Sequence, residues 1–581
     1  MSDWIGATQG LAIDGVNSAV RPDLIGPNQV SWAMNATVRD GKPRTRTALV
    51  QRAFLPSGRV QGAGFFNVGN GEIILMIGGR PYRITATGDN FTTQALELPW
   101  YNSTTLPTAW MCETSGYFVI QDGESAPIIY NGGSIRRSDI FNNEVPIGRQ
   151  MAYGNGRLAV AVAGHNLKVG DITDGDGSEL LFTETNYLSN GGAFFYPNEI
   201  TALAFLPSNN TATGYGSLMV FGLRSTDSLR LEITQRDLWS TIPGFQVVVL
   251  DNIGACSQMS MVRVNQDLYW RDAKGEVRSL RSAAAAADSP GNSSISREVS
   301  RIVDFETDNW LTQSGGMFFD NRIFFLSSPF LSDDNVTAFQ NIISLDAAPL
   351  ATMRSKAPPA YDGVWNGAQF TRMVKGMFNG VERGFVISSD ADGLNRLWEF
   401  VPGQRTDIYL TDGTTMAKAD SRIVSQVEFR RFGMDEPNQL KRLTRADIYP
   451  SEIEGDVNVK LYWRVGNTDQ WFFCDEVNFC AQMTDGTSTV PHDWKNLRSQ
   501  TRLQIRSFTF PQEVNDVFKL STTVGYDFQI RLVWTGNMLI DRLDVWVSKL
   551  TNPRFSNISE LESECIQYEV SDNEVTYSIL P

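Results

Sequence analysis

The sequence predicts an all-β protein in which a β-propeller is followed by a C-terminal β-sandwich of jelly-roll-like type. Two observations predict this fold. A unit of two short apolar runs around a Gly-, Asp- or Asn-rich turn recurs seven times between residues 70 and 400, and longer alternating runs follow it. The units begin roughly 40 to 65 residues apart, the period expected of propeller blades. They predict six to eight blades, with seven as the direct count.

Each recurring unit is typical of a β-hairpin, because apolar runs of strand length flank residues that favour turns. A small antiparallel sheet cannot bury its faces alone, so we expect the units to stack side by side around an axis. The seven units are Gly71–Thr85, Ser115–Tyr130, Gly156–Gly170, Gly216–Ile233, Asn265–Leu280, Asn321–Leu345 and Arg383–Phe400.

The pattern of residues 1–59 predicts an irregular N-terminal arm that contributes a closing strand to the propeller. Prolines interrupt this segment, and proline fixes the backbone and removes a hydrogen-bond donor. The arm is also locally basic, which suits contact with an acidic neighbour, although a solvated basic face is the alternative. The residues that we single out as interaction candidates are Arg39, Lys42, Arg44 and Arg46.

We place the propeller at residues 60–418 and expect one short helical insertion at about 281–305. An alanine run is followed there by a Ser-Pro-Gly turn, and then by Ile295, Val299 and Ile302 at helical spacing. This pattern predicts two short helices joined by a loop. The insertion is either an excursion that connects two blades or a projecting contact element.

The second domain is expected at residues 419–551, where the runs become longer and alternate. Antiparallel strands of this kind make a sandwich with one wet face on each sheet. Residues 552–581 are expected to form an acidic C-terminal extension whose order depends on docking. The predicted strands are Ile423–Arg430, Asp456–Arg464, Leu503–Pro511, Phe528–Thr535 and Leu543–Ser548.

Composition argues against a protein that grips nucleic acid. The 581 residues carry a net charge of −15, whereas phosphate binding requires clustered Lys and Arg. An acidic surface suits DNA that must slide past without adhering, and plain solubility is the alternative reading. The five cysteines fit assembly in a reducing cytoplasm. No signal peptide or membrane-spanning segment is expected.

Chemistry-bearing motifs are scarce, so we predict a non-enzymatic protein with no catalytic, cofactor-binding or metal residues. Only two histidines occur, His165 and His492, and neither belongs to a recognisable catalytic or metal motif. No phosphate-binding glycine loop is present. Trp100-Tyr101 and Trp471–Phe473 are candidate platforms for sugar rings, and interior packing is the alternative.

Three segments resemble large tail proteins of short-tailed bacteriophages. The first lies within Gly15–Val50, and the second is Arg278–Val299, similar to a helix-bearing linker after a middle blade. The third is Phe528–Val547, similar to a C-terminal pair of strands, and this resemblance implies a turn at Thr535-Gly536-Asn537. In the first segment Thr47-Ala48 replaces the usual Pro-Gly. The residues that carry the first resemblance are Asn17, Pro27, Gln29, Asn35, Ala36, Arg39, Gly41, Thr45 and Arg46.

The resemblance implies a tail nozzle or hub of the virion, assembled in the host cytoplasm as a ring of six copies. The ring would line or gate the channel through which genomic DNA leaves, without sequence-specific binding. Adaptor and fibre proteins of the tail would be its neighbours, and no membrane insertion is implied. Two alternatives stay open: a receptor-binding or fibre-attachment protein that contacts host glycans, and a glycoside hydrolase built on the propeller.

Overall fold

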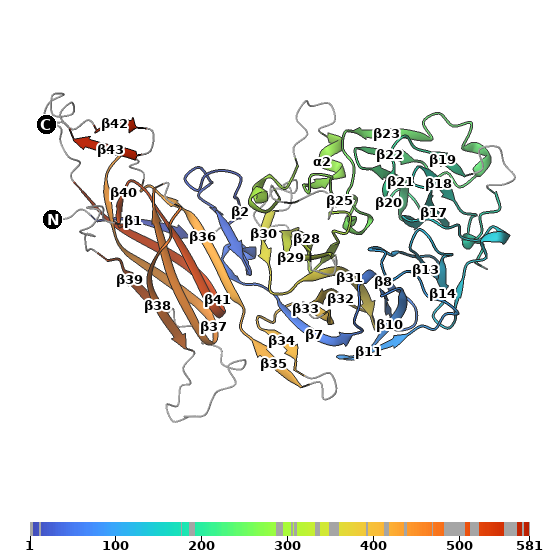
Figure 1. The fold of residues 1–581 in the computed structure, drawn as a ribbon, viewed down its shortest axis with the longest axis horizontal. Coiled ribbons are helices and arrows are strands. Elements are labelled where there is room, and N and C mark those ends of the chain that lie inside the picture. Colours follow the sequence, from blue (N-terminus) through green and yellow to red (C-terminus); the bar gives the residue numbers. More distant parts are fainter. Residues whose placement is uncertain are drawn as a thin grey trace.

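The computed structural model shows a mostly β chain with a round body at one end and a stack of long strands at the other (Figure 1). The residues that it describes are 4–10, 13–175, 177–184, 192–285, 294–303, 306, 311–331, 337–347, 360–390, 393–411, 417–434, 438–466, 469–480, 506–511, 522–550, 566–571 and 574–579.

Five separate antiparallel sheets follow one another along the first part of the round body. Four of them have four strands, and the fifth has three. The strands of the first two sheets are β8 (Val60–Phe66), β9 (Glu72–Ile77), β10 (Arg80–Thr87), β11 (Asn90–Ala95), β12 (Trp110–Glu113), β13 (Phe118–Gln121), β14 (Ile128–Tyr130) and β15 (Ile135–Arg137). Those of the next three are β16 (Met151–Gly154), β17 (Arg157–Val162), β18 (Asn166–Val169), β19 (Ala193–Phe195), β20 (Ile200–Pro207), β21 (Tyr215–Gly222), β22 (Ser225–Leu229), β23 (Gln246–Asp251), β24 (Val262–Val264), β25 (Asp267–Arg271) and β26 (Val277–Ser279).

Two further sets of neighbouring strands complete the round body, and both merge into the large sheet of the chain. In the second set the outer strand is β7, which comes from the N-terminal arm and pairs antiparallel with β33. The strands of these sets are β27 (Gly316–Phe319), β28 (Arg322–Leu331), β29 (Thr337–Asp346), β30 (Ala360–Trp365), β31 (Phe370–Phe378), β32 (Val381–Ser389), β33 (Asn395–Val401) and β7 (Ala48–Leu55).

The first strands of these sets meet around the centre of the body. β8 contacts β12 on one side and β31 on the other, β12 contacts β16, β16 contacts β20, and β24 contacts β27, which contacts β31. This arrangement is a β-propeller, so the predicted all-β propeller is confirmed. Each of the seven predicted units also forms the antiparallel hairpin expected of it. Six of these hairpins lie at the middle of a set of four strands, and the fifth joins the middle and last strands of the three-stranded sheet.

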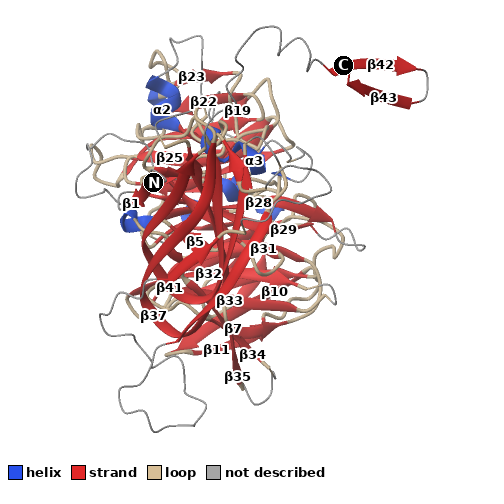
Figure 2. Cartoon of the chain, turned by 90° about the vertical axis from the view of Figure 1, so that its left-hand side faces the viewer, coloured by secondary structure: helices blue, strands red, loops and turns tan. Residues whose placement is uncertain are grey.

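The C-terminal part is built on two very long antiparallel strands, β37 (Lys441–Val465) and β41 (Phe528–Lys549), which pair over most of their length. One half of the pair is flanked by β1 and β39, and the other half by β36 and β38. Figure 2 shows β37 and β41 running down the end of the molecule that faces the viewer. The flanking strands are β1 (Trp4–Gly10), β36 (Val424–Phe432), β38 (Phe472–Cys480), β39 (Arg506–Thr509) and the short β40 (Val524–Gly525).

The predicted turn at Thr535-Gly536-Asn537 is wrong, because β41 continues through it as one strand. Gly536 has φ +112°, a conformation that favours glycine, and the pairing with β37 shifts register between Glu454 and Asn458. The extra residues on β37 therefore absorb the irregularity as a bulge, and both long strands bend without ending.

Helices are few and short in the described part of the chain. The predicted insertion contains α2 (Leu280–Ala285), η6 (Arg297–Val299) and α3 (Ser300–Val303), and residues 286–293 between them lie outside the described part of the chain. Within the described residues, none of the helices has the length and apolar character needed to cross a membrane. The remaining single turns are η1 (Arg39–Gly41), η2 (Ile140–Asn142), η3 (Ser178–Leu180), η4 (Arg236–Leu238) and η5 (Gln258–Ser260).

The propeller is held together by apolar layers between neighbouring sheets and by buried polar links. Arg271 of β25 is fully buried, and its side chain forms an ion pair with Glu306 and donates to the carbonyl of Leu326 in β28 at 2.8 Å. Glu306 also accepts from the hydroxyl of Ser327 at 2.6 Å. Because burial disfavours the charged form, the pKa of Arg271 is lowered to about 10.

We predict that Glu306→Ala lowers the free energy of unfolding by about 3–5 kcal/mol, because it leaves the Arg271 charge buried without its partner. Urea denaturation followed by tryptophan fluorescence measures the change. The double variant Arg271→Met/Glu306→Leu should recover most of the loss, since apolar residues replace a buried ion pair at little cost. Glu199→Ala removes half of an exposed pair with Arg149 and should cost less than about 1 kcal/mol. A loss for Glu306→Ala as small as that control would contradict the prediction.

Candidate functional site

The N-terminal arm lies between the propeller and the long C-terminal strands, and both parts pair with it (Figure 1). β4 (Trp32–Met34) pairs parallel with β30 of the propeller and antiparallel with β36 on the C-terminal side. β6 (Arg44–Thr45) bridges to Leu539 of β41. The arm also contains β2 (Gly15–Val16), β3 (Gln29–Val30) and β5 (Ala36–Thr37), and β7 ends it.

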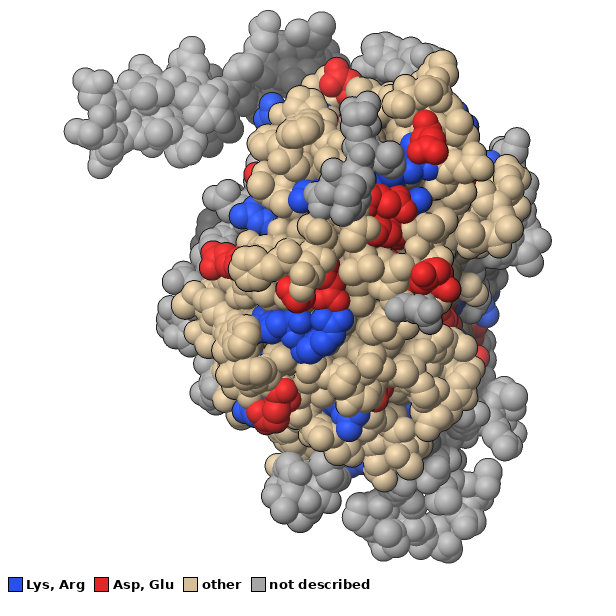
Figure 3. All heavy atoms as spheres, turned by 90° about the vertical axis from the view of Figure 1, so that its right-hand side faces the viewer, with Lys and Arg blue, Asp and Glu red and all other residues tan. Residues whose placement is uncertain are grey.

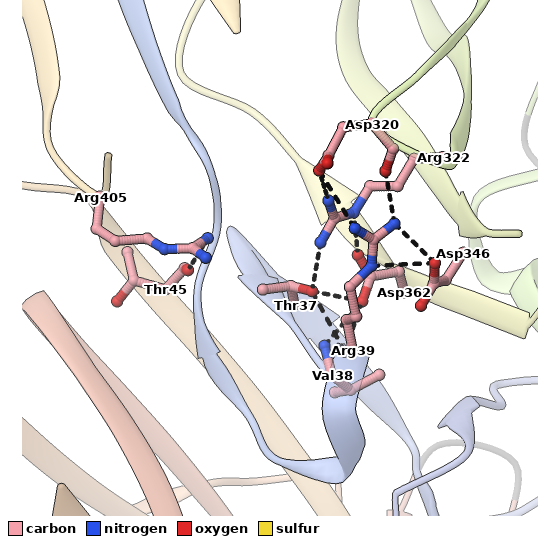
Figure 4. A network of polar contacts seen from close by, with 9 residues as sticks. All are labelled: Thr37, Val38, Arg39, Thr45, Asp320, Arg322, Asp346, Asp362 and Arg405. Carbon is pink, nitrogen blue, oxygen red and sulfur yellow. Dashed lines mark hydrogen bonds and ion pairs between the residues drawn. The ribbon is translucent and has the colours of Figure 1, made fainter. Parts of the chain in front are cut away.

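At the centre of this junction is the carboxylate of Asp362 in β30, which is 1% exposed. One of its oxygens accepts from the hydroxyl of Thr37 at 2.5 Å and from the backbone N–H groups of Val38 and Arg39 at 2.9 and 3.0 Å. The other oxygen accepts from Nε of Arg322 at 2.8 Å (Figure 4). This carboxylate thus fixes the backbone of the arm and a propeller strand in one place.

Arg39, the first sequence candidate, extends the same network into the propeller. Its guanidinium donates to the carboxylate of Asp346 at 2.7 and 3.0 Å and to the backbone carbonyl of Asp320 at 2.8 Å. The Asp320 carboxylate also pairs with Arg322. Figure 4 shows the two guanidinium groups side by side, with carboxylates of Asp320, Asp346 and Asp362 around them.

Arg46 is the most buried of the four candidates, at 1% exposure. Its guanidinium donates to both oxygens of Asp407, at 2.9 and 2.7 Å, and to the side-chain carbonyl of Asn35 at 3.0 Å. Asp407 also accepts from the backbone N–H of Leu49 at 2.8 Å. This bidentate pair fastens the arm to β34 (Asp407–Leu410), which in turn pairs with β35 (Lys418–Ser421).

The other two candidates face the C-terminal strands. Lys42 pairs with Asp541 of β41 at 2.5 Å, and Arg44 pairs with Glu452 of β37 at 2.8 Å. Glu452 is largely exposed, so the second pair contributes little. All four basic candidates therefore contact acidic residues of their own chain, and their contact with another protein stays a prediction.

The acidic partners in this junction were missed by the sequence reasoning. Asp320, Asp362 and Asp407 lie hundreds of residues away from the arm in the chain, and no local motif marks them. The one available signal is that each sits at or near the end of an apolar run, where a carboxylate is unusual and needs a partner. Only the folded structure shows which basic residue of the arm each of these carboxylates meets.

Opposing effects act on the charges of this junction. Burial alone would raise the pKa of Asp362, but the Arg322 charge and the Thr37 hydroxyl outweigh it, so its pKa lies below the ordinary value. Burial would lower the pKa of Arg322, but its attraction to Asp362 raises it. Burial lowers the pKa of Arg405 to about 10, and its guanidinium donates to the carbonyl of Thr45 at 3.1 Å.

The two aromatic candidates differ in exposure. Trp100 is 57% and Tyr101 40% exposed, and the guanidinium groups of Arg137 and Arg80 lie over these rings. Trp471 is only partly exposed, because the guanidinium groups of two arginines lie over its ring, 4.6 and 4.0 Å from its centre. Phe473 of the second candidate is 51% exposed, so both candidates present an exposed aromatic ring, and only Trp100-Tyr101 presents two adjacent ones.

The part of the chain that the structure describes contains no cluster of three or more His, Cys, Asp or Glu residues that could hold a metal ion. Cys112, Cys256 and Cys474 are free thiols. His492 lies outside the described residues.

No protein-family model and no curated protein matches this sequence. Among solved structures it is similar to the WD40 β-propeller domain of Doa1, with 10% identity and a TM-score of 0.34 over 61% of this chain and 98% of that one. It is also similar to BBS1N in complex with ARL6DN, with 8% identity and a TM-score of 0.37 over 62% of this chain and 99% of that one. A third similar structure is YCF48 bound to the D1 peptide, with 10% identity and a TM-score of 0.34 over 61% of this chain and 95% of that one.

We predict that Asp362→Ala lowers the free energy of unfolding by about 3–5 kcal/mol, because it leaves Arg322 and the arm N–H groups buried without their acceptor. Limited trypsin digestion should then cleave the arm after Arg44 or Arg46, each of which is followed by threonine, faster than in the wild type. The control Asp390→Ala removes half of a partly exposed pair with Arg396 and should leave both measurements nearly unchanged. Unchanged cleavage in Asp362→Ala would refute the role of this carboxylate.

The same carboxylate predicts a pH dependence. Because the pKa of Asp362 is lowered in the folded chain, its contribution is fully present above the unfolded value of about 3.9 and is lost as pH falls through the folded value. We expect the stability difference between wild type and Asp362→Asn to be constant from pH 7 to about 5 and to shrink below about pH 4. Urea denaturation across this range measures it, and a difference that grows on acidification contradicts the assignment.

Proposed function

We propose that this chain is a non-enzymatic structural subunit of a phage tail, a nozzle or hub that assembles as a ring of six copies in the virion. The ring lines or gates the DNA exit channel, and adaptor and fibre proteins are its neighbours. Assembly takes place in the host cytoplasm. The resemblance of the N-terminal arm, the middle linker and the C-terminal strands to such proteins motivates the proposal.

The observation that carries the proposal is the junction built by the arm. A single apolar cluster includes Val30 and Ala33 of the arm, Phe325 and Ile343 of the propeller, and Leu461 of the C-terminal strands. Propeller and C-terminal part are therefore packed through one core and not merely tethered by a linker. A subunit whose two parts share one core suits the wall of a channel through which DNA passes.

The finer architecture that we propose is a seven-bladed propeller followed by a β-sandwich. The five separate sheets supply five blades, and the sets β27–β30 and β31–β33 with β7 supply the sixth and seventh. In the sandwich, β1, β41, β37 and β39 form one layer, and β36, β41, β37 and β38 form the other. The long strands pass from one layer to the other at the Gly536 bulge.

Charge supports a channel that does not retain DNA. The net charge of −15 repels phosphates, and the arm's basic candidates are engaged with carboxylates. Arginine residues that could otherwise neutralise phosphates, such as Arg46 and Arg271, are buried. DNA would therefore pass this surface without sequence-specific contact.

Electron microscopy of the purified protein and of phage particles tests the proposal. We expect ring-shaped particles with a central channel, and the same density at the tail end of the virion, identified by antibody labelling of this chain. Monomers that never form rings, together with absence of the chain from purified particles, would refute it.

A receptor-binding or fibre-attachment protein is the second candidate, and the exposed Trp100-Tyr101 pair favours it, because aromatic faces stack on sugar rings. In this case a glycan array should show saturable binding that Trp100→Ala abolishes. Phe195→Ala, which removes another exposed aromatic residue, should keep the binding. An array without reproducible signals dismisses this candidate.

A further inference from the structure

The C-terminal end of the chain forms a hairpin that pairs with no other described strand. β42 (Ile566–Ser571) and β43 (Glu574–Ile579) make a two-stranded sheet of their own. An isolated two-stranded hairpin is marginally stable in water, so its order requires a surface on which to dock.

The register of this hairpin separates its residues by polarity. The pairs at one set of alternate positions are Ile566 with Ile579, Tyr568 with Tyr577 and Val570 with Val575. Alternate positions of a strand share a face, so one face of the hairpin is entirely apolar or aromatic in sequence. The other face is polar, and residues 566–581 contain acidic residues but no Lys or Arg.

The propeller offers a matching surface at β23, the outer strand of its sheet. β23 pairs with β22 alone among the described strands, and Val247 and Val248 are 46% and 62% exposed. The register with β22 shifts at Val249, which leaves Gln246–Val248 as the regular part of the edge. Edge strands are normally guarded by charged residues or proline, and this part of β23 has neither.

Other outer strands do not share this character. β11 exposes polar residues such as Asn90 and Thr92, β15 carries Arg136 and Arg137, and β19 is only three residues long. Beside β23 is a mainly apolar hollow of about 440 Å³ lined by Val249, Met219 and Leu280, among others. β23 is therefore the outer edge with both free backbone and apolar surroundings.

Position and charge indicate whether the hairpin that pairs with β23 belongs to the same copy of the chain or to another copy. The strands that lead to the hairpin lie at one end of the long axis, whereas β23 lies on the far part of the propeller (Figure 1). Figure 3 shows that mostly uncharged residues cover that far end, with charged residues in small groups. Arg224 and Arg230 are exposed at the two ends of β22, next to β23, and suit an acidic hairpin. Arg230 also pairs with Glu232.

We propose that the hairpin of one copy adds to the β23 edge of a second copy of this chain, with its apolar face over the hollow. Donor and acceptor surfaces differ, so the contact is head-to-tail and closes into a ring when the rotation permits. The inference rests on the self-association part of the proposed function. It is independent of where the ring is used.

Two variants and their mixture test the inference by mass photometry of the full chain. A chain truncated after Leu550 lacks the donor hairpin, and Val248→Lys places a charge on the acceptor edge. We expect the wild type to assemble and each variant alone to be monomeric. The circular dichroism spectrum of Val248→Lys should be unchanged, and that of the truncated chain should lack only the contribution of the hairpin. Mixed, the two should form a 1:1 dimer, because the hairpin of Val248→Lys can still dock on the intact edge of the truncated chain. Val381→Lys, at an equally exposed valine on another sheet, should assemble as the wild type does.

Three outcomes overturn the inference. A wild-type chain that stays monomeric at all concentrations refutes self-association and with it the ring. Rings that persist in both variants refute the hairpin contact but leave the ring function standing. Monomeric variants that fail to form a dimer when mixed show that the hairpin docks on its own chain.

Discussion

The structure depends on one buried carboxylate. Asp362 accepts hydrogen bonds from the arm backbone and from Arg322 at once, and no water is needed to satisfy it. A buried charge that is satisfied by groups from two parts of the chain holds those parts in a single arrangement, because any other arrangement leaves a charge unpaired. The arm can therefore be polar and irregular and still be a fixed part of the core.

The same logic recurs between propeller sheets, where Arg271 and Glu306 form a second buried pair. Apolar layers supply most of the driving force, but they are tolerant of small shifts, and buried ion pairs are less so. The two kinds of contact thus have different roles. Apolar packing holds the sheets together, and the Arg271–Glu306 pair links specific positions in β25 and β28.

Sequence reasoning worked where the signal is local. All seven hairpins were predicted from apolar runs and turn residues, because a hairpin's strands are neighbours in the chain. It failed at Gly536, where a turn-like tripeptide lies in a continuous strand, since the bulge depends on extra residues in the distant β37. The basic side of the arm was visible in the sequence, but acidic partners such as Asp362 and Asp407 follow only from the fold.

Closure of the propeller by β7 has a consequence for biosynthesis. Leu55 pairs with Asn395, so the arm leaves the ribosome long before the strand that it must join exists. At about 5–20 residues per second this delay amounts to tens of seconds, during which the apolar residues of β7 lack their native partner. The nascent chain is thus exposed to mispairing until β33 emerges, and chaperones that shield amino-terminal strands would matter most in that interval.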